Sequence, residues 1–174
     1  MSVISVHRPR IKLARTGWSE LAMLTTYVAA LAGIYLSVGF LYYYAAKEKL
    51  IDNSGMMPAG LRKEFAGSLF ASVPGDNASW VLLGALEAGV VILLAMSLIR
   101  GEFLTSRRKP LLLAGLAVSM LTLGVMSVAN NMVGDFATAM DVFTYFGLTA
   151  VLMLVIHQLP PYRSLGWLAG AAEK

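Results

Sequence analysis

The chain has 174 residues, of which 57% are hydrophobic and only 14% are charged, and its mean hydropathy is +0.68. A soluble domain averages about 45–50% apolar and about 25% charged residues, so this composition is that of an integral membrane protein. The sequence contains no cysteine, which excludes disulfides, thiolate metal sites and iron–sulfur ligation. Any electrons that the protein handles must therefore be carried by a bound cofactor.

Four apolar stretches are long enough to cross a bilayer. A hydrocarbon core of about 30 Å needs roughly 20 predominantly apolar residues in a helix. The sequence therefore predicts an all-α, integral membrane four-helix bundle that forms a single domain over residues 1–174. Its spans are expected near Leu21–Ala46, Ser79–Ile99, Leu111–Asn130 and Ala137–His157.

Residues at the ends of these stretches suit helix boundaries. Asp76 or Ser79 can cap the second span, and Pro110 suits the first turn of the third. The fourth span is expected to end before Pro160 and Pro161, because proline cannot continue a helix. Nothing in the first twenty residues is typical of a cleavable signal peptide, so we expect the first span to be retained.

The first connection, residues 47–78, contains a short amphipathic pattern. Leu61, Phe65 and Leu69 recur at i, i+4 and i+8, while charged residues lie between them. This pattern predicts a short interfacial helix that covers the outer end of the bundle as a lid. The alternative is an interfacial connector without a function of its own.

The distribution of lysine and arginine predicts the orientation of the bundle. The tail of residues 1–20 contains Arg8, Arg10, Lys12 and Arg15, and the second connection contains Arg100, Arg107, Arg108 and Lys109 against Glu102 alone. Such basic segments stay on the cytoplasmic side. We therefore expect a protein of the bacterial cytoplasmic membrane with both termini in the cytoplasm. The net charge of +4 therefore reflects topology and contact with anionic membrane lipids, and we expect no nucleic-acid partner.

The second span carries a single carboxylate, Glu87, about eight residues from its start. At 1.5 Å per residue this is roughly 12 Å deep, where a charge costs about 2.5–3.5 kcal/mol on insertion scales. Glu87 should therefore face the bundle. Small residues around it let another helix approach closely: Gly84, Ala85, Ala88 and Gly89.

Other polar residues are expected near the same end of the bundle. They come from the end of the first span and from the third and fourth spans: Lys49, Asn130, Asn131, Asp141 and Tyr145. One interpretation is a functional site, since ionisable groups inside a membrane are functional candidates. The other is a hydrogen-bonded or ion-paired cluster that fixes the helix register. Whether Lys49 reaches Glu87 depends on where the first helix ends.

Two segments resemble the DoxX-like family of four-helix bacterial membrane proteins (the DoxX/DoxD group). They are YAAKEKLID (Tyr44–Asp52), at the end of the first span, and WVLLGALE (Trp80–Glu87), which opens the second. In that family an acid–lysine pair ends the first helix, and a tryptophan precedes a glutamate in the second. The likeness covers roughly residues 31–132 and matches Lys49 and Glu87 to the family's charged pair.

The resemblance implies a membrane subunit of a quinone-linked redox assembly, without independent catalysis, and therefore no catalytic residue is assigned. Under this interpretation Glu87 would exchange a proton with a quinol, and Asn130, Asn131 and Tyr145 could donate to the ring carbonyls. No covalently bound cofactor is expected, and quinone and lipid are the candidate ligands. The alternative is an accessory subunit that stabilises a larger respiratory or photosynthetic complex by contacts with other membrane subunits.

Metal and haem sites are not expected. The sequence has neither HExxH nor ExxH spacing, and its two histidines are His7 in the tail and His157 at the end of the fourth span. A tail residue without a helical frame is a poor axial ligand, so each imidazole is expected at a surface or interface.

Overall fold

The structure is a computed structural model that describes residues 17–162. The helical elements in chain order are α1 (Gly17–Lys47), η1 (Glu48–Asp52), α2 (Ala59–Phe65), η2 (Ala71–Gly75), α3 (Asp76–Ile99), α4 (Pro110–Met132) and α5 (Phe136–Gln158). The described part of the chain is helical, and four of its helices are long and apolar enough to cross a membrane. The predicted all-α architecture with four long apolar helices is thereby confirmed. The basic residues predicted in the tail, and His7, lie outside the described residues.

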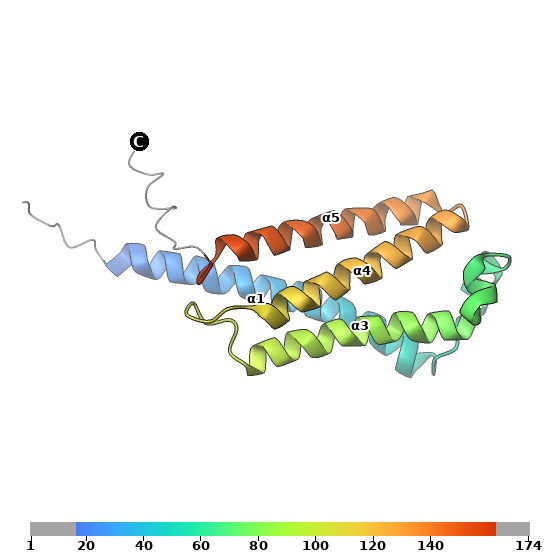
Figure 1. Ribbon diagram of the computed structural model, residues 1–174, viewed down its shortest axis with the longest axis horizontal. Helices are drawn as coiled ribbons and strands as arrows, with labels where there is room; N and C mark the ends of the chain where they lie inside the picture. Colours follow the sequence, from blue (N-terminus) through green and yellow to red (C-terminus); the bar gives the residue numbers. More distant parts are fainter. Residues whose placement is uncertain (1–16, 163–174) are drawn as a thin grey trace, which may run out of the picture.

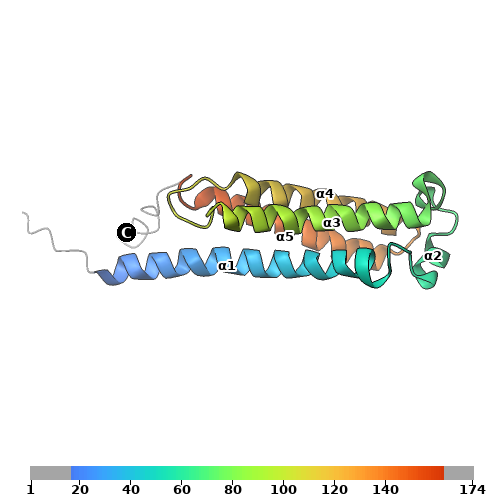
Figure 2. The same ribbon diagram turned by 90° about the horizontal axis from the view of Figure 1, so that it is seen from below.

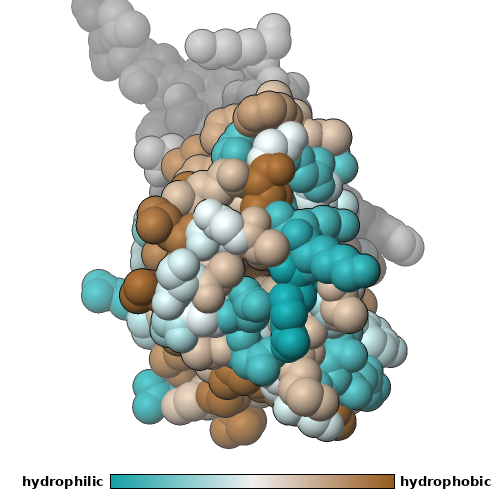
Figure 3. Space-filling model, turned by 90° about the vertical axis from the view of Figure 1, so that its right-hand side faces the viewer, coloured by the Kyte–Doolittle hydropathy of each residue, from teal (hydrophilic) through white to brown (hydrophobic). Residues whose placement is uncertain are grey.

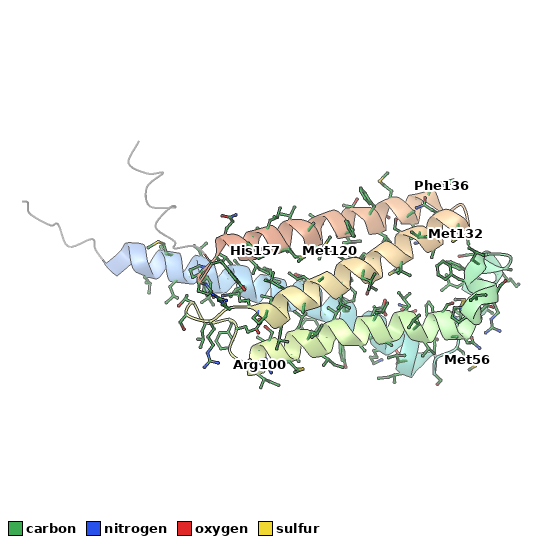
Figure 4. The ribbon with its side chains drawn as sticks, in the orientation of Figure 1. Met56, Arg100, Met120, Met132, Phe136 and His157 are labelled. Atoms are coloured by element: carbon green, nitrogen blue, oxygen red, sulfur yellow. The ribbon has the colours of Figure 1, made fainter. Side chains whose placement is uncertain are left out.

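The four long helices run side by side along the longest axis of the molecule (Figures 1 and 2). Their backbones approach closely along three seams, α1 with α3, α3 with α4, and α4 with α5. Met56, Met132 and Phe136 lie at the end that carries α2, and Arg100 and His157 lie at the opposite end (Figure 4). We call these the α2 end and the Arg100 end.

The core is a narrow stripe along the bundle axis. From α1 it takes Tyr27, Leu31, Ile34, Val38 and Tyr42, which are spaced by three or four residues and therefore share one helix face. The other helices contribute Val90, Leu94, Leu112, Leu116 and Ile156. Only 22–33% of the most apolar window of each span is buried, so most apolar side chains face outward, as in helices that meet lipid.

The observed helix boundaries agree with some of the predicted signals and correct others. Pro110 occupies the first turn of α4, and α5 ends at Gln158 before the two prolines. The predicted cap of the second span was wrong: α3 begins after Gly75, whose φ of +103° suits glycine, and no side chain caps it. Ser79 instead donates a hydrogen bond to the carbonyl of Phe70. Backbone geometry therefore replaces the expected side-chain cap.

The predicted helix in the first connection is present but shorter than the pattern indicates. α2 ends at Phe65, and the chain then turns through Gly67, whose φ is +89°. Leu69 lies beyond this turn and is 67% exposed, so it does not continue the stripe of Leu61 and Phe65. Figure 3 views the α2 end directly, where hydrophilic side chains gather beside hydrophobic ones.

Candidate functional site

A buried ion pair joins the end of α1 to α3. Lys49 Nζ lies 3.0 Å from Glu87 Oε1, and the two side chains are only 7% and 2% exposed. Lys49 belongs to η1, the π-helical turn that continues directly from α1, so its position follows from where the first helix ends. The two residues that the family resemblance matches are therefore in direct contact.

A glycine makes this contact possible. Gly84 lies one turn before Glu87, and a Cβ added there would lie 3.0 Å from the Cβ of Lys49 and from the side chain of Leu50. The other small residues do not share this contact: Ala85 is exposed, Ala88 is half-buried, and no heavy atom lies within 4 Å of a Cβ added at Gly89. Of the two glycines in this segment, only Gly84 lies where the end of α1 approaches α3 closely.

An aromatic ring completes the surroundings of the lysine. Lys49 Nζ lies 4.7 Å from the centre of the Trp80 ring, within the range of a cation–π interaction. Trp80, Gly84 and Glu87 are all buried and, at spacings of four and three residues, share one face of α3. The WVLLGALE segment thus supplies the ring, the space and the counter-ion for one cation.

Two polar atoms beside this pair have no hydrogen-bond partner among the described residues. They are Glu87 Oε2 and Trp80 Nε1, and both are inaccessible to solvent. A buried polar group without a partner costs free energy, and native structures contain few of them. The polar groups at this position are therefore only partly satisfied by the protein itself.

A cavity of about 390 Å³ opens beside the ion pair at the α2 end. Its walls are mostly apolar and come from the first connection and from α3, α4 and the start of α5. The polar lining residues are Glu48, Lys49, Ser79, Asn130 and Thr138, and the aromatic ones are Phe65, Phe70 and Trp80. Glu87 does not line the cavity and lies behind Lys49.

The structure brings together only part of the predicted polar cluster. Asn130 lines the cavity, whereas Asn131 is exposed and donates a hydrogen bond to the carbonyl of Ser127. Asp141 is exposed, and Tyr145 lines a different groove, between α1 and α5. Successive helical residues differ by about 100° in direction, so neighbours in sequence can face different surroundings. The cavity therefore contains Lys49 and Asn130 but not the other predicted donors.

A second pair of buried charges, at the Arg100 end, was not singled out by the sequence. Glu102 is 3% exposed and accepts a hydrogen bond from Ser97 Oγ at 2.7 Å, which is itself 2.7 Å from the hydroxyl of Tyr35. The backbone N–H groups of Leu111 and Leu112 also donate to Glu102, at 3.0–3.1 Å. The carboxylate thus caps the N-terminus of α4, where negative charge is favourable.

Lys109 is fully buried at the same end. Its Nζ donates to the carbonyls of Pro160 at 2.6 Å and Arg107 at 3.2 Å, and it lies 5.4 Å from the centre of the Tyr27 ring. Burial lowers the pKa of Lys109, and the charge of Glu102 partly opposes that shift. From the sequence alone, both residues are interpreted as charges that flank the membrane spans. The sequence signal for the cap is Glu102, an acid in the short connection that precedes the helix starting at Pro110.

The described residues contain no group of three or more histidine, cysteine, aspartate or glutamate side chains that could hold a metal ion. His157 is exposed, and its ring lies 5.3 Å from that of Tyr162. An interfacial position therefore fits this imidazole.

No protein-family model, curated protein or solved structure matches the chain. The chemistry of the cavity must therefore be inferred from its own geometry. Ligand pockets have volumes of about 300–1,000 Å³, mostly apolar walls and a few polar groups that orient the ligand. The cavity at the α2 end has these properties and suits a small amphipathic molecule.

Proposed function

We propose that the protein is a DoxX-like membrane subunit of a quinone-linked redox assembly, and that the cavity at the α2 end binds the quinone ring. The subunit has no catalytic activity of its own in this proposal. It lies in a bacterial cytoplasmic membrane with both termini inside, which places the α2 end on the outer side.

The observation that carries this proposal is the combination of apolar and polar groups in the cavity. A quinone is a flat apolar ring with two carbonyl acceptors. Asn130 and Thr138 supply hydrogen-bond donors, and Phe65 and Phe70 supply aromatic surface. The lining therefore offers both kinds of contact that a quinone ring requires.

Lys49 is the cation nearest the proposed ligand, and Glu87 orients it. The ion pair and the Trp80 ring hold the ammonium at the wall of the cavity. In this proposal the Lys49 ammonium would give one of its protons to the Glu87 carboxylate, and the resulting amine would then accept the proton that a quinol releases, because Glu87 does not line the cavity. This order differs from direct exchange between a quinol and Glu87.

The test compares two neighbouring asparagines. Purified protein in lipid nanodiscs would be titrated with a short-chain benzoquinone, with binding measured by equilibrium dialysis. Asn130→Ala should weaken binding about tenfold, because one hydrogen bond to the ligand is lost. Asn131→Ala is the matched control and should bind normally, since Asn131 is exposed and bonds within α4.

A cavity-filling variant gives the complementary measurement. Ala129 lines the cavity, so Ala129→Phe should occupy the ligand's space and abolish saturable binding while the protein remains folded by circular dichroism. Equal quinone affinity in the wild type, Asn130→Ala and Ala129→Phe would refute the proposal.

A second candidate function is an accessory subunit that stabilises a larger membrane complex. One observation favours it: Asp141, an ionisable residue inside α5, is exposed on the outside of the bundle. Intramembrane charges normally face protein, so this exposure indicates a contact with another chain.

A further inference from the structure

The side of the bundle between α1 and α5 is more open than the other three. Close backbone contacts join α1 to α3, α3 to α4 and α4 to α5, but α1 and α5 are not joined in this way. A groove of about 310 Å³ lies between them, with α4 at its floor. We call it the lateral groove. Its lining residues are Ser37, Val38, Leu41, Tyr42, Ser119, Leu123, Tyr145, Leu148, Thr149 and Leu152.

Several hydroxyl groups along the lateral groove already have partners within the protein. Tyr42 and Ser119 are hydrogen-bonded to each other, with 2.7 Å between their hydroxyl oxygens. Ser37 donates to the carbonyl of Gly33, and Thr149 donates to the carbonyl of Tyr145. These hydroxyl groups therefore do not require hydrogen bonds from a bound partner, and the groove suits a partner with an apolar surface.

The carboxylate of Asp141 lies on the same face of α5 as the residues that line the lateral groove. Asp141, Tyr145, Leu148 and Leu152 are spaced by four, three and four residues, which places them on one face of α5. The last three line the groove, and Asp141 continues their stripe one turn toward the α2 end. It is exposed and forms no ion pair with any residue that the structure describes.

The depth of Asp141 makes this exposure costly in lipid. α5 has 23 residues, which at 1.5 Å each is about 35 Å, and Asp141 lies about 8 Å from the start of the helix. It is therefore about 5 Å inside a hydrocarbon core of about 30 Å centred on the helix. An aspartate side chain is short and carries its charge close to the backbone. A cation on a neighbouring helix would offset the cost, whereas a lipid tail would not.

We infer that the lateral groove and Asp141 form a docking surface for a transmembrane helix of another subunit, which carries a lysine or arginine opposite Asp141. The partner's apolar side chains fill the groove beside Leu148 and Leu152, and its cation pairs with the carboxylate. A long lysine or arginine stem can reach this depth from the membrane interface. The inference rests on the proposed role as a subunit and adds the site and chemistry of assembly.

A second copy of this chain fits the surface poorly. The described cations nearest the α2 end are Lys47, Lys49, Arg62 and Lys63. Lys47 pairs with Asp52, Lys49 pairs with Glu87, and Arg62 and Lys63 lie in α2 outside the spans. Within the described residues, no unpaired cation on a membrane-spanning face matches the depth of Asp141. Charge complementarity therefore favours a different chain.

The test uses a photo-crosslinking amino acid in the native membrane. Incorporated at Leu148, in the groove, it should form an adduct with a transmembrane segment of another protein. Incorporated at Ile92, which is 57% exposed on α3, it serves as the control and should not crosslink to that segment. The adduct peptide, identified by mass spectrometry, should lie next to a lysine or arginine at the depth of Asp141.

Charge variants make the test specific. Asp141→Asn should lower the yield of the Leu148 adduct about tenfold, and Asp141→Lys should lower it further through like-charge repulsion. Exchanging the partner's cation for aspartate should restore the adduct in Asp141→Lys. Because Asp141 is exposed, each variant should fold, which circular dichroism and gel filtration would verify.

Adducts with lipid alone, with a second copy of this chain, or with a segment lacking a basic residue would each overturn the inference. So would a yield unchanged in Asp141→Lys. The quinone test separates this failure from that of the proposed function: Asp141→Asn should lose the partner and keep quinone affinity, whereas Asn130→Ala should do the reverse.

Discussion

The two ends of the bundle each bury one lysine and one glutamate, but they satisfy these charges differently. At the Arg100 end, Glu102 accepts bonds from one hydroxyl and two backbone N–H groups, and Lys109 donates to two backbone carbonyls. At the α2 end, Lys49 and Glu87 rely mainly on each other, and Glu87 Oε2 and Trp80 Nε1 have no described partner.

This difference separates a structural role from a functional candidate. The polar groups at the Arg100 end join the connection between α3 and α4 to the start of α4 and to the residues that follow α5. The pair at the α2 end borders a cavity of about 390 Å³. Fully satisfied networks rigidify a fold, whereas partly satisfied groups next to a cavity can be completed by a ligand.

The largest effect is expected from removing the carboxylate at the Arg100 end. Glu102→Ala would leave Ser97 Oγ and two N–H groups at the start of α4 without their acceptor, which we expect to cost about 3–5 kcal/mol. Thermal unfolding in detergent should show a large fall in Tm, with a smaller fall for Glu102→Gln. An unchanged Tm for Glu102→Ala would show that the hydrogen bonds of Glu102 do not stabilise the fold.

The next effect tests the pair at the α2 end by a double-mutant cycle. Lys49→Met and Glu87→Leu should each destabilise the protein by about 3 kcal/mol, since each leaves one buried charge unpaired. The double variant should be more stable than either single variant, because hydrophobic residues often replace a buried ion pair at little cost. The cycle would be measured by denaturant unfolding. Additive effects would mean that the two residues act independently.

Two glycines on α3 provide a matched comparison of packing. Gly84→Ala should destabilise the bundle by about 1–3 kcal/mol, because its Cβ would lie 3.0 Å from the Cβ of Lys49. Gly89→Ala should instead stabilise it by about 0.5–1 kcal/mol, since the position is open and alanine favours a helix. Opposite shifts of Tm would confirm the close contact, and equal shifts would contradict it.

The smallest effect is a pH dependence that originates at the Arg100 end. Because burial lowers the pKa of Lys109 below its ordinary value of 10.5, the unfolded chain binds more protons than the folded one between these two values. The contribution of Lys109 to the free energy of unfolding should therefore increase as pH rises through this alkaline window. Lys109→Met should remove that contribution. Equal alkaline slopes in the two proteins would show that the folded state does not disfavour the charged lysine.

Much of the fold follows from local sequence patterns. The spans expected at 79–99, 111–130 and 137–157 lie inside the observed helices Asp76–Ile99, Pro110–Met132 and Phe136–Gln158, because apolar length is a property of contiguous residues. The start of α4 at Pro110 likewise follows from the chemistry of one residue. Leu69 shows the limit: its spacing fits a longer helix, but the chain leaves the helix after Phe65.

The candidate site depends on long-range contacts. The sequence predicts six polar residues near one end, yet only Lys49 and Asn130 line the cavity, and Glu87 is paired with Lys49. Asp141 and Tyr145 face elsewhere because the packing of α5 against α4 fixes its rotation about its own axis. Similarly, the sequence does not distinguish Lys109 from other flanking charges. Its burial depends on the contact with the carbonyl of Pro160, which follows α5.

The sequence by itself determined the membrane class, the four apolar helices and the presence of a carboxylate that lipid would not tolerate. These depend on composition and on residues close together along the chain. Only the tertiary structure decided which charges meet, which side of the bundle stays open and where the cavity lies. Those features depend on the rotation and approach of whole helices, which are set by contacts such as that of Gly84 with Lys49, between residues far apart in sequence.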